Sequence, residues 1–404
     1  MTRTATPTLV AAAIAVLAGT ALASASCAPI HASRVQTTRL ISRSTGGGTP
    51  NGASTNPVIS GDRRYARVIA FESEASNLVG GDTNGLKDVF ATARGGSFDN
   101  TGTQWYPGKT LLLSRGRGGT PANGPSWGAS VDGNFRTAPR CVAFLSAASN
   151  LVAGDTNGRV DAFLSRGPGD SLTRVSLPAN RQSASSATAV AVSGDCSRTA
   201  FVAGGHLYTR VGSTTHTVNT PAAPADPSFA QGETNDLVFG ASGGVYLSRD
   251  GTGDARKLVD GAANPAYNAL KRQVVAYEKR RGGAVQVAWR DLGGSEHVAS
   301  SNDAGRPGDR DSRGPVVVNS GYYIGFESDA TNLGAGPGPH AYLYTDVRKM
   351  TQVRSVGNSG APLPGGGRHP GVSYYANYIV FSSPAPLGAP TGADQIFMRW
   401  LGSV

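Results

Sequence analysis

The sequence has very little of the two charged residues that most often cover exposed helices. It contains six glutamates and six lysines among 404 residues, and charged residues of all kinds make up 16% of the chain. Glutamate and lysine are strong helix formers, so their scarcity excludes a coiled coil or a helical bundle. Long hydrophobic runs are also missing beyond the first 25 residues, so no transmembrane span is expected.

Turn-forming residues are abundant instead. Glycine (55 residues) and proline (24 residues) together supply about a fifth of the chain, which is well above ordinary usage. The glycines follow no three-residue period, which excludes collagen. A hydrophobic fraction of 39% is enough to form a core, so wholesale disorder is not expected. The composition predicts a large, turn-rich, all-β protein.

The formal net charge of +10 comes from basic residues that are scattered along the chain. A basic chain has some affinity for anionic polymers. The densest basic run, Lys279-Arg280-Arg281, fits a solvated hairpin turn. The chain has no basic stripe interleaved with aromatic residues of the kind that nucleic-acid binders use, so we expect no nucleic-acid partner.

The N-terminus has the features of an export signal. Arg3 supplies a positive start, Leu9 to Ala23 is mostly apolar, and Ala23-Ser24-Ala25 fits a small-residue cleavage site. This pattern predicts a signal peptide over residues 1–25, a linker over 26–36 and a folded domain over 37–404. The location is then secreted or extracytoplasmic.

Three cysteines are present in the whole chain. Cys27 follows the predicted cleavage site and is a lipidation candidate, although a lipobox usually has Leu where this chain has Ser24. Cys27 in an unstructured, unmodified segment is the alternative. Cys141 and Cys196 flank equivalent strands of neighbouring repeats and could form a disulfide in an oxidising compartment.

Repeated segments run along the chain. The clearest pair of copies runs from Val68-Ile-Ala-Phe to Asp88-Val-Phe and from Val142-Ala-Phe to Asp161-Ala-Phe, and both contain Gly-Asp-Thr-Asn-Gly. Further copies begin at Ile324 and Ile379, and weaker ones at Thr199, Leu237 and Val274. Each repeat has two short β-rich runs joined by a turn.

Most repeats have a proline-marked run before these strands and another β-like run after them. The proline markers are Pro57, Pro125, Pro227, Pro265, Pro315 and Pro370. Four short antiparallel strands repeated radially form a β-propeller. The last repeat lacks its fourth strand, and Thr37-Thr-Arg-Leu-Ile-Ser-Arg can supply it and close the ring. Seven blades are predicted, with six or eight as alternatives because repeats four and five are irregular.

The repeats resemble those of the TolB-like propellers, a WD-like repeat family of exported bacterial proteins. The residues that match best are Pro125-Ser-Trp-Gly, Asp132-Gly133, Val142-Ala-Phe and Asp161-Ala-Phe, followed by Pro57, Ser60, Asp62 and Ile69-Ala-Phe. The resemblance covers residues 37–404 and implies the fold, while propellers carry many unrelated functions. The α/β domain that TolB carries before its propeller has no counterpart here, so a role in the Tol–Pal system does not carry over.

The Gly-Asp-Thr-Asn-Gly segments are candidate calcium loops. The oxygen-bearing residues at alternating positions are Asp82, Asn84 and Asp88 in one copy, and Asp155, Asn157 and Asp161 in the other. Such hard oxygen ligands can converge on one ion when glycine allows the bend. The alternative is a tight turn at each Asn-Gly, with the aspartates bonded to loop backbone. No glutamate follows at the twelfth position, so the turn is favoured. No other cofactor is expected.

Other candidate sites are weaker. Gly124-Pro-Ser126-Trp-Gly128 matches a nucleophile-elbow string but lacks the helix that this motif requires. The six histidines show no close metal-ligand spacing; they are His31, His206, His216, His297, His340 and His369. No catalytic residue is therefore assigned.

The sequence leaves the function open between two classes. We favour an exported, monomeric, non-enzymatic propeller that presents loops to a protein or glycan partner at one face. The alternative is a polysaccharide hydrolase or lyase with acids or histidines in the central funnel, and a weaker third option is an exported domain without its catalytic half. Three titratable groups converging at the channel would favour the enzyme, whereas small and aliphatic lining would favour the binder.

Overall fold

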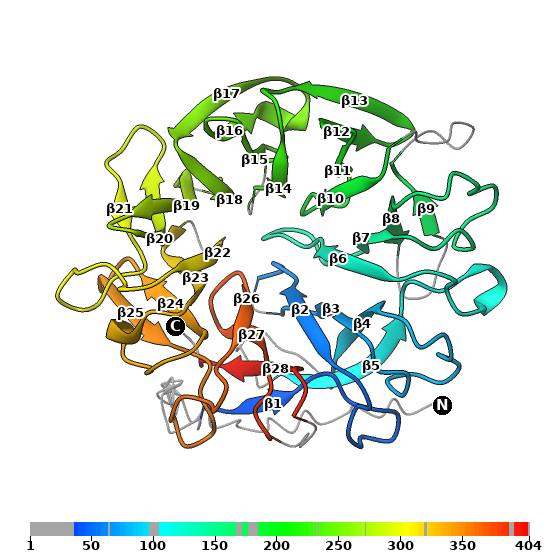
Figure 1. Cartoon of the computed structure of the whole chain (residues 1–404), viewed down its shortest axis with the longest axis horizontal. Coiled ribbons are helices and arrows are strands. Elements are labelled where there is room, and N and C mark those ends of the chain that lie inside the picture. The colour runs from blue at the N-terminus through cyan, green and yellow to red at the C-terminus, as the bar shows by residue number, and fades with distance from the viewer. Residues whose placement is uncertain are drawn as a thin grey trace, which may run out of the picture. The chain divides into compact units, whose positions relative to one another are not determined.

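A computed structural model of the chain describes residues 36–63, 65–96, 105–166, 172–176, 185–230, 232, 234–270, 272–318, 321–387 and 392–402. The chain divides into two compact units, Met1–Arg34 and Val35–Val404, and every described residue belongs to the second. The predicted signal peptide, Cys27 and His31 lie outside the described residues. In the second unit, sheets stand around a central axis (Figure 1).

Strands dominate this unit, and no α-helix occurs among its described residues. Short 3-10 turns are found at η1 (Arg117–Gly119), η2 (Arg249–Gly251) and η4 (Thr331–Leu333). No helix in the described part of the chain is long and apolar enough to cross a membrane. The prediction of an all-β fold is confirmed, and the physical reason is the sequence's short apolar runs separated by glycine-rich turns.

Within the described residues the strands form five four-stranded sheets and one eight-stranded sheet. Repeat 1 consists of β2 (Ser54–Ile59), β3 (Val68–Ser73), β4 (Asp88–Gly95) and β5 (Tyr106–Leu112). Repeat 2 consists of β6 (Ser126–Val131), β7 (Cys141–Ser146), β8 (Asp161–Arg166) and β9 (Leu172–Arg174). Repeat 5 consists of β18 (Ala262–Asn268), β19 (Val274–Arg281), β20 (Ala284–Asp291) and β21 (His297–Val298). Repeat 6 consists of β22 (Ser312–Val318), β23 (Tyr323–Ser328), β24 (His340–Thr345) and β25 (Met350–Val353).

The N-terminal strand belongs to the same sheet as the last three strands. Repeat 7 consists of β26 (Arg368–Val372), β27 (Tyr378–Ser383), β28 (Gln395–Trp400) and β1 (Thr38–Leu40). Strand β1 pairs antiparallel with β28, with Arg39 opposite Met398. The two ends of the second unit are therefore hydrogen-bonded to each other.

The eight-stranded sheet contains two antiparallel groups of four strands. Repeat 3 consists of β10 (Ala187–Val192), β11 (Arg198–Ala203), β12 (His206–Val211) and β13 (Thr214–Asn219). Repeat 4 consists of β14 (Ala225–Phe229), β15 (Leu237–Ala241), β16 (Gly244–Ser248) and β17 (Gly253–Asp260). A short parallel contact joins them, with Val218 opposite Gly253 and Asn219 opposite Asp254.

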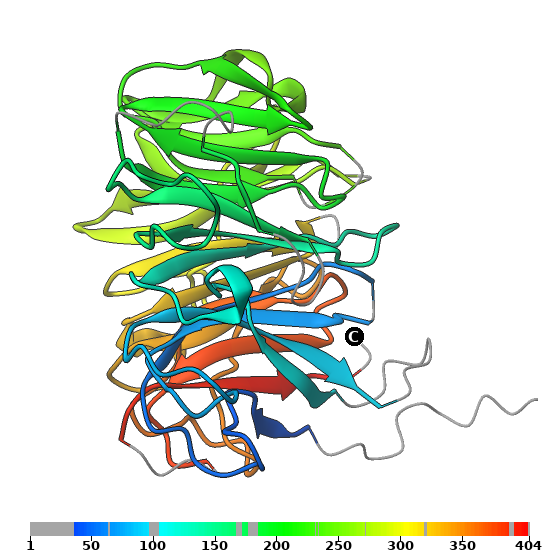
Figure 2. The same cartoon turned by 90° about the vertical axis from the view of Figure 1, so that its right-hand side faces the viewer.

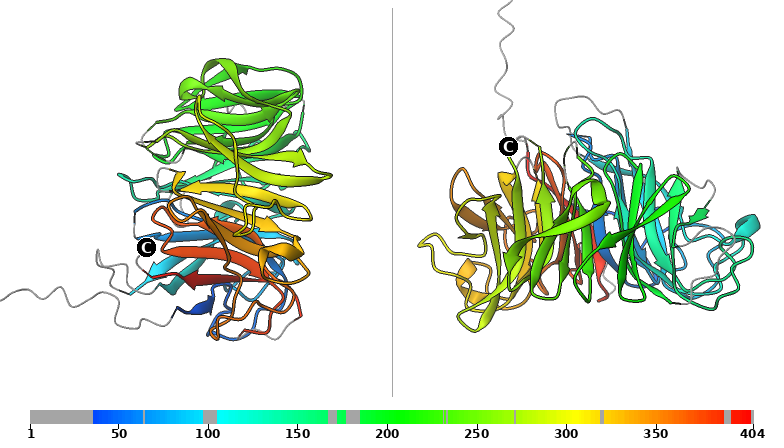
Figure 3. Two further views of the ribbon diagram at one scale, coloured as in Figure 1. Left: turned by 90° about the vertical axis from the view of Figure 1, so that its left-hand side faces the viewer. Right: turned by 90° about the horizontal axis from the view of Figure 1, so that it is seen from above.

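The first strand of each repeat lies nearest the axis, and the fourth lies at the rim (Figure 1). Seen from the side, the strands run across the thickness of the ring, so the loops collect on its two faces (Figures 2 and 3). Because neighbouring strands are antiparallel, the loops between first and second strands all lie on one face. The loops between fourth and first strands lie on the opposite face.

A phenylalanine of the second strand packs the middle of six of the seven described repeats, opposite an aromatic residue of the third strand. Phe71 on β3 lies directly opposite Phe90 on β4, with ring centroids 5.9 Å apart. Equivalent cross-strand pairs are Phe144–Phe163, Phe201–Tyr208, Phe239–Tyr246, Phe326–Tyr342 and Phe381–Phe397. Directly opposed aromatic side chains stabilise antiparallel pairs, which explains why the same spacing recurs in the sequence.

The hydrophobic core lies between neighbouring repeats. One cluster joins Phe71 and Phe90 of repeat 1 to Tyr378 and Met398 of repeat 7. The other clusters of buried residues likewise combine residues of two adjacent repeats. Each sheet therefore covers both of its apolar faces with its neighbours, as the radial arrangement of a propeller requires.

The first strand of each repeat carries an irregularity where its register with the second strand shifts. In five repeats the residue before a proline has a positive φ there; these residues are Asn56, Asp226, Asn264, Gly314 and His369. Proline suits this position because it lacks an N–H and the inner edge of the sheet has no strand partner. The prolines also prevent further strands from pairing with that edge.

The proline marker of repeat 2 is displaced from the others. Pro125 precedes β6, whereas Pro57 lies inside β2. The residue that corresponds to Pro57 is Ala129, because Ser126 and Ser54 occupy equivalent places opposite Ser146 and Ser73. Gly128 then supplies the positive φ (68°) of this irregularity. Matching Pro125 to Pro57 therefore shifts the strand of repeat 2 by four residues. In this repeat Gly128 takes the positive φ that the residue before proline takes in five other repeats.

Three of the six glutamates hold neighbouring repeats together. The carboxylate of Glu72 on β3 accepts hydrogen bonds from the backbone N–H of Gly128 in repeat 2 (2.8 Å) and from Nδ2 of Asn56 (2.9 Å). Glu278 accepts in the same way from the N–H of Gly314, and Glu327 from that of His369. Each glutamate therefore satisfies a backbone donor that the irregular first strand of the next repeat leaves without a ladder partner.

We expect Glu72→Ala to lower the free energy of unfolding by about 1.5–3 kcal/mol, because two donors lose a charged acceptor in a buried setting. Glu74→Ala is the matched control, since Glu74 lies two residues away and is exposed, and a change within about 0.5 kcal/mol is expected there. Urea unfolding of the three proteins measures both values. Equal effects of the two substitutions would contradict the proposed bridging by Glu72.

Candidate functional site

The first strands of all seven repeats surround a channel of about 500 Å³. Five prolines line it, namely Pro57, Pro227, Pro265, Pro315 and Pro370, and Ala129 and Ala189 line it in the two remaining repeats. The residues after them are mainly small or aliphatic, such as Val58 and Val316. The channel wall is thus formed by the strand irregularities described above.

Charged groups are scarce in this channel. Asp226 is the one carboxylate among the described lining residues, and the adjacent wall raises its pKa by desolvation. Trp127, Asn264 and Tyr267 add further polar or aromatic surface. General acid–base cleavage of a glycosidic bond uses two carboxyl groups, and the described lining offers one.

An aromatic–arginine patch, made of Arg63, Phe135, Tyr374 and Tyr375, lies at one end of the channel. Its residues come from the loops that directly follow the channel-lining strands β2, β6 and β26. The guanidinium of Arg63 lies 4.8 Å from the centre of the Phe135 ring, and that ring is 5.6 Å from Tyr374. Arg63 is exposed, whereas Phe135 and Tyr375 are half-buried. Aromatic and arginine side chains held this way are typical of binding hot spots.

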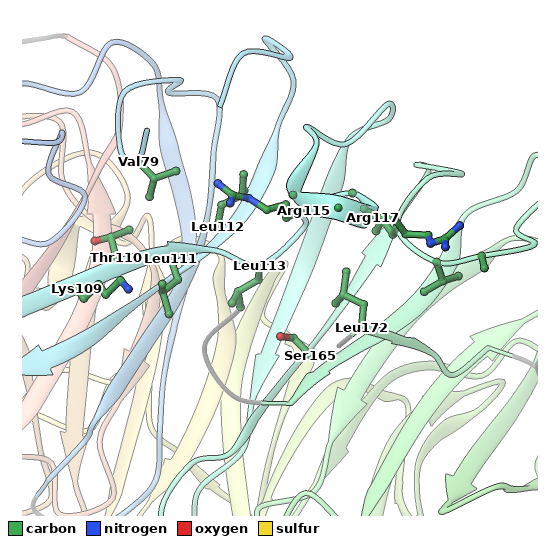
Figure 4. A pocket seen from close by; sticks show the side chains of 16 residues that line it. Val79, Lys109, Thr110, Leu111, Leu112, Leu113, Arg115, Arg117, Ser165 and Leu172 are labelled. Carbon is green, nitrogen blue, oxygen red and sulfur yellow. The ribbon is translucent and has the colours of Figure 1, made fainter. Parts of the chain in front are cut away.

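A second hollow lies at the rim between repeats 1 and 2 and encloses about 710 Å³ (Figure 4). Its floor contains Leu111, Leu113 and Leu172, and Arg115 and Arg117 stand along its edge (Figure 4). No acidic residue is among the described lining residues. The hollow is therefore apolar below and cationic at its border.

The Gly-Asp-Thr-Asn-Gly loop of repeat 1 connects β3 to β4. Asn84 Nδ2 donates to Asp88 Oδ2 (2.7 Å), and Asn84 Oδ1 accepts from the N–H of Leu86 (3.0 Å). Gly85 has a φ of 64°, which a side chain would strain. The asparagine thus forms an Asx turn, and Ser114 Oγ ties Asp88 Oδ1 to the fourth strand.

Burial raises the pKa values of both aspartates of this loop. The pKa of Asp88 rises to about 6, with desolvation as the main cause and repulsion from Asp82 as a further one. Burial also raises the pKa of Asp82, and the backbone amide of Asn84 and the charge of Arg115 oppose this rise. The loop brings Asp82, Asn84 and Asp88 together, as the sequence predicts for either a turn or an ion site.

The corresponding loop of repeat 2 also brings its three residues together. Asn157 Nδ2 donates to Asp161 Oδ2 (2.8 Å), and the N–H of Arg159 donates to Asn157 Oδ1 (2.9 Å). In addition, Arg174 Nη1 lies 2.9 Å from Asp155 Oδ1 and 3.5 Å from Asp161 Oδ2. A buried guanidinium therefore compensates the two carboxylates. Arg174 could not be assigned to this loop from the sequence, because the pairing of β8 with β9 is needed to place it there.

Cys141 and Cys196 form a disulfide, with Sγ atoms 2.02 Å and Cα atoms 6.1 Å apart. The bond links the start of β7 in repeat 2 to the turn before β11 in repeat 3. Asp132 lies beside it, and ligand atoms of Asp132, Cys141 and Cys196 fall within 4.8 Å of one another. Metal binding requires thiolates, and both sulfurs are taken up by the disulfide.

Asp132 follows β6 in the loop that leads to β7, and it is fully buried. Its carboxylate accepts hydrogen bonds from the backbone N–H groups of Arg140 (2.8 Å) and Cys141 (2.9 Å). Burial nevertheless raises the pKa of Asp132 to about 7, and the nearby charge of Asp62 adds to the rise.

The remaining candidates have structural partners. Ser126 is buried and donates to Ser146 Oγ (2.8 Å). His340 begins β24, where its Nδ1 lies 3.0 Å from Ser355 Oγ, and His297 stacks on Trp289. Sequence reasoning had no means of finding the channel lining, the aromatic–arginine patch or the rim hollow, because each combines residues of separate repeats.

No family model matches the chain, and no curated protein matches it in sequence. Among solved structures, an oligogalacturonate lyase from Vibrio parahaemolyticus is similar over 91% of this chain and 97% of that chain, with 10% identity and a TM-score of 0.52. A puromycin-hydrolyzing peptidase from Mycobacterium tuberculosis is similar over 86% of this chain and 52% of that chain, with 10% identity and a TM-score of 0.51. At such identities the likeness concerns the fold alone. Together with the radial sheets, it shows that the second unit is a β-propeller-type structure.

We expect the stability of the protein to fall as pH rises from about 4 toward 7, in part through Asp132. Its folded pKa of about 7 lies above the ordinary value near 3.9. Between these values the folded state binds more protons than the unfolded state, so a rise in pH favours unfolding. Asp132→Asn should lose this contribution, which is on the order of 1 kcal/mol per pH unit. Urea midpoints at pH 5, 6, 7 and 8 compare the two proteins.

The difference in stability between the wild type and Asp132→Asn at each pH separates the effect of Asp132 from that of other groups that titrate in the same range. A wild type that gains stability over Asp132→Asn as pH rises would contradict the prediction. That result would mean that the backbone hydrogen bonds to the carboxylate outweigh its burial.

Proposed function

We propose that this chain is an exported, non-enzymatic, TolB-like propeller that binds a protein or glycan partner at one face. The observation that supports the binding role most directly is the lining of the channel by prolines and small aliphatic residues, with Asp226 as its one described carboxylate. A hydrolase or lyase acting there would need several converging acids or histidines. The low-identity likeness to a lyase and a peptidase supplies no catalytic residue.

The proposed architecture has seven blades, one for each repeat. Repeats 3 and 4 each have four antiparallel strands and touch through a contact of two residue pairs, which supports counting them as two blades. The pairing of β1 with β28 supports closure of the ring by the N-terminal strand. Closure by two chain segments from opposite ends removes two exposed sheet edges.

The aromatic–arginine patch is the proposed partner-binding surface. It combines an exposed Arg63 with the half-buried rings of Phe135 and Tyr375, on loops supported by rigid strands. Tilted and edge-on contacts between the rings hold these side chains in place before a partner arrives, which lowers the entropy that binding would cost. Aromatic rings beside a guanidinium suit contacts with a sugar ring or with a peptide side chain.

We further propose that the protein acts as a monomer outside the cytoplasm. The large exposed hydrophobic residues among those described are Tyr106, Tyr322 and Val347. Tyr106 lies in repeat 1, whereas Tyr322 and Val347 lie in neighbouring loops of repeat 6. Stable self-association usually needs a larger contiguous apolar patch than these two side chains provide. Export is supported by the N-terminal signal pattern and by a disulfide between Cys141 and Cys196.

Binding and turnover can be separated in one experiment. The mature protein is incubated with polygalacturonate, cellulose, chitin and peptidoglycan, and both retained protein and new reducing or unsaturated ends are measured. We expect retention on at least one polymer without release of product. Phe135→Ala and Arg63→Ala should each weaken retention about tenfold or more, as for loss of a hot-spot residue.

Arg310→Ala is the matched control, because the exposed Arg310 precedes β22 and so lies on the opposite face. Product release by the wild type would contradict the non-enzymatic proposal. Equal retention of the wild type and both patch variants would exclude the patch as the binding surface.

Processing of the chain can be tested by intact mass. When the full chain is expressed in an exporting bacterium, we expect cleavage after Ala25, one disulfide between Cys141 and Cys196, and Cys27 as the one cysteine that alkylates without reduction. Lipidation would instead make Cys27 the first residue and add the mass of the lipid. Retention of residues 1–25, or three alkylated cysteines before reduction, would contradict export into an oxidising compartment.

A further inference from the structure

The two Gly-Asp-Thr-Asn-Gly loops are built alike. In both, the asparagine amide donates to the second aspartate, at 2.7 Å for Asn84 to Asp88 and 2.8 Å for Asn157 to Asp161. In both, a serine two residues after the end of the fourth strand donates to the other oxygen of that aspartate: Ser114 to Asp88 Oδ1 and Ser176 to Asp161 Oδ1. The loops can therefore be compared atom by atom.

They differ in the residue that faces the two aspartates from the fourth strand. In repeat 2, Arg174 lies opposite Phe163, and its guanidinium contacts both Asp155 Oδ1 and Asp161 Oδ2. In repeat 1, the residue opposite Phe90 is Leu112. Because Phe90 and Phe163 hold equivalent places in their sheets, repeat 1 has an apolar side chain where repeat 2 has a cation.

Among the described residues, no buried cation contacts the aspartates of repeat 1. Asp82 is 5% exposed, and its Oδ1 atom is buried without a hydrogen-bond partner among the described residues. The corresponding atom in repeat 2, Asp155 Oδ1, accepts from Arg174 at 2.9 Å. A buried carboxylate oxygen without a partner is strongly unfavourable, so the missing guanidinium calls for a substitute.

We propose that a calcium ion binds between Asp82 and Asp88 in repeat 1, where Arg174 supplies the positive charge in repeat 2. The candidate ligand atoms are Asp82 Oδ1 and Asp88 Oδ2, the counterparts of the two oxygens that contact Arg174. Calcium accepts carboxylate oxygens and completes its coordination with water or carbonyl groups. Calcium binding leaves the Asx turn of Asn84 in place. In repeat 2, Asp161 Oδ2 accepts hydrogen bonds from both Asn157 and Arg174, so the equivalent oxygen of Asp88 can bind Asn84 and a cation together.

A site with two carboxylates is expected to be weak. Extracellular calcium modules bind in the range of about 10⁻⁴–10⁻³ M, and we expect a value in that range. The loop of repeat 2 should not bind, because its guanidinium already occupies the space between the carboxylates. This proposal stands apart from the partner-binding role and does not depend on it.

The test is calorimetric titration of the mature protein with CaCl₂, with KCl at matched ionic strength as the control titrant. We expect one site in the wild type and a melting temperature that rises with calcium. Leu112→Arg places the guanidinium of repeat 2 into repeat 1 and should abolish binding without loss of fold. Arg174→Leu reproduces the leucine of repeat 1 in repeat 2 and should increase the number of sites from one to two.

Asp82→Asn keeps the shape of the loop while removing its charge, and it should abolish binding even if Leu112→Arg fails to fold. Asp155→Asn is the matched control in the other loop and should leave the wild-type site intact. Absence of calcium binding by the folded wild type would overturn the proposal, and it would indicate that a proton or the exposed Arg115 compensates Asp82. Binding that survives both Asp82→Asn and Leu112→Arg would overturn it as well.

Discussion

Burial of apolar surface between neighbouring repeats is the constraint on which the rest of this structure depends. A four-stranded sheet has two apolar faces here, and each hydrophobic cluster combines residues of two adjacent repeats. No repeat can therefore bury its core alone, and stability comes from interfaces that follow one another around the axis. The pairing of β1 with β28 matters for the same reason, because it completes the sheet of repeat 7, which packs against repeats 6 and 1.

This arrangement also determines which polar residues are needed inside. The irregular first strands free backbone N–H groups such as that of Gly128, and the scarce glutamates are used to accept from them. In repeats 1 and 2, the aspartate at the start of the third strand accepts a hydrogen bond from a serine that follows the fourth strand. Repeats 1 and 2 share the Gly-Asp-Thr-Asn-Gly loop but differ at one position of the fourth strand. Arg174 contacts both carboxylates in repeat 2, whereas repeat 1 has Leu112 at that position and leaves Asp82 Oδ1 without a hydrogen-bond partner among the described residues.

The functional surfaces follow from the same geometry. Strand irregularities place prolines along the channel, which gives it an apolar wall with few groups able to transfer protons. Three of the loops that follow those strands combine into the aromatic–arginine patch. A rigid ring that presents loops is a common basis for recognition, and this arrangement supports the proposal of a binding role.

Much of the architecture could be predicted from the sequence. The shortage of glutamate and lysine, the recurring Ala-Phe spacing and the glycine-rich turns determined an all-β repeat structure, because these patterns act through neighbours in the chain or across one ladder. Tertiary structure alone decided that Ala129 replaces Pro125 at the channel, that Arg174 enters one Asp-Asn loop, and that Arg63 meets Phe135. These contacts join segments whose separation in the sequence carries no information about their separation in space, so packing between sheets had to place them.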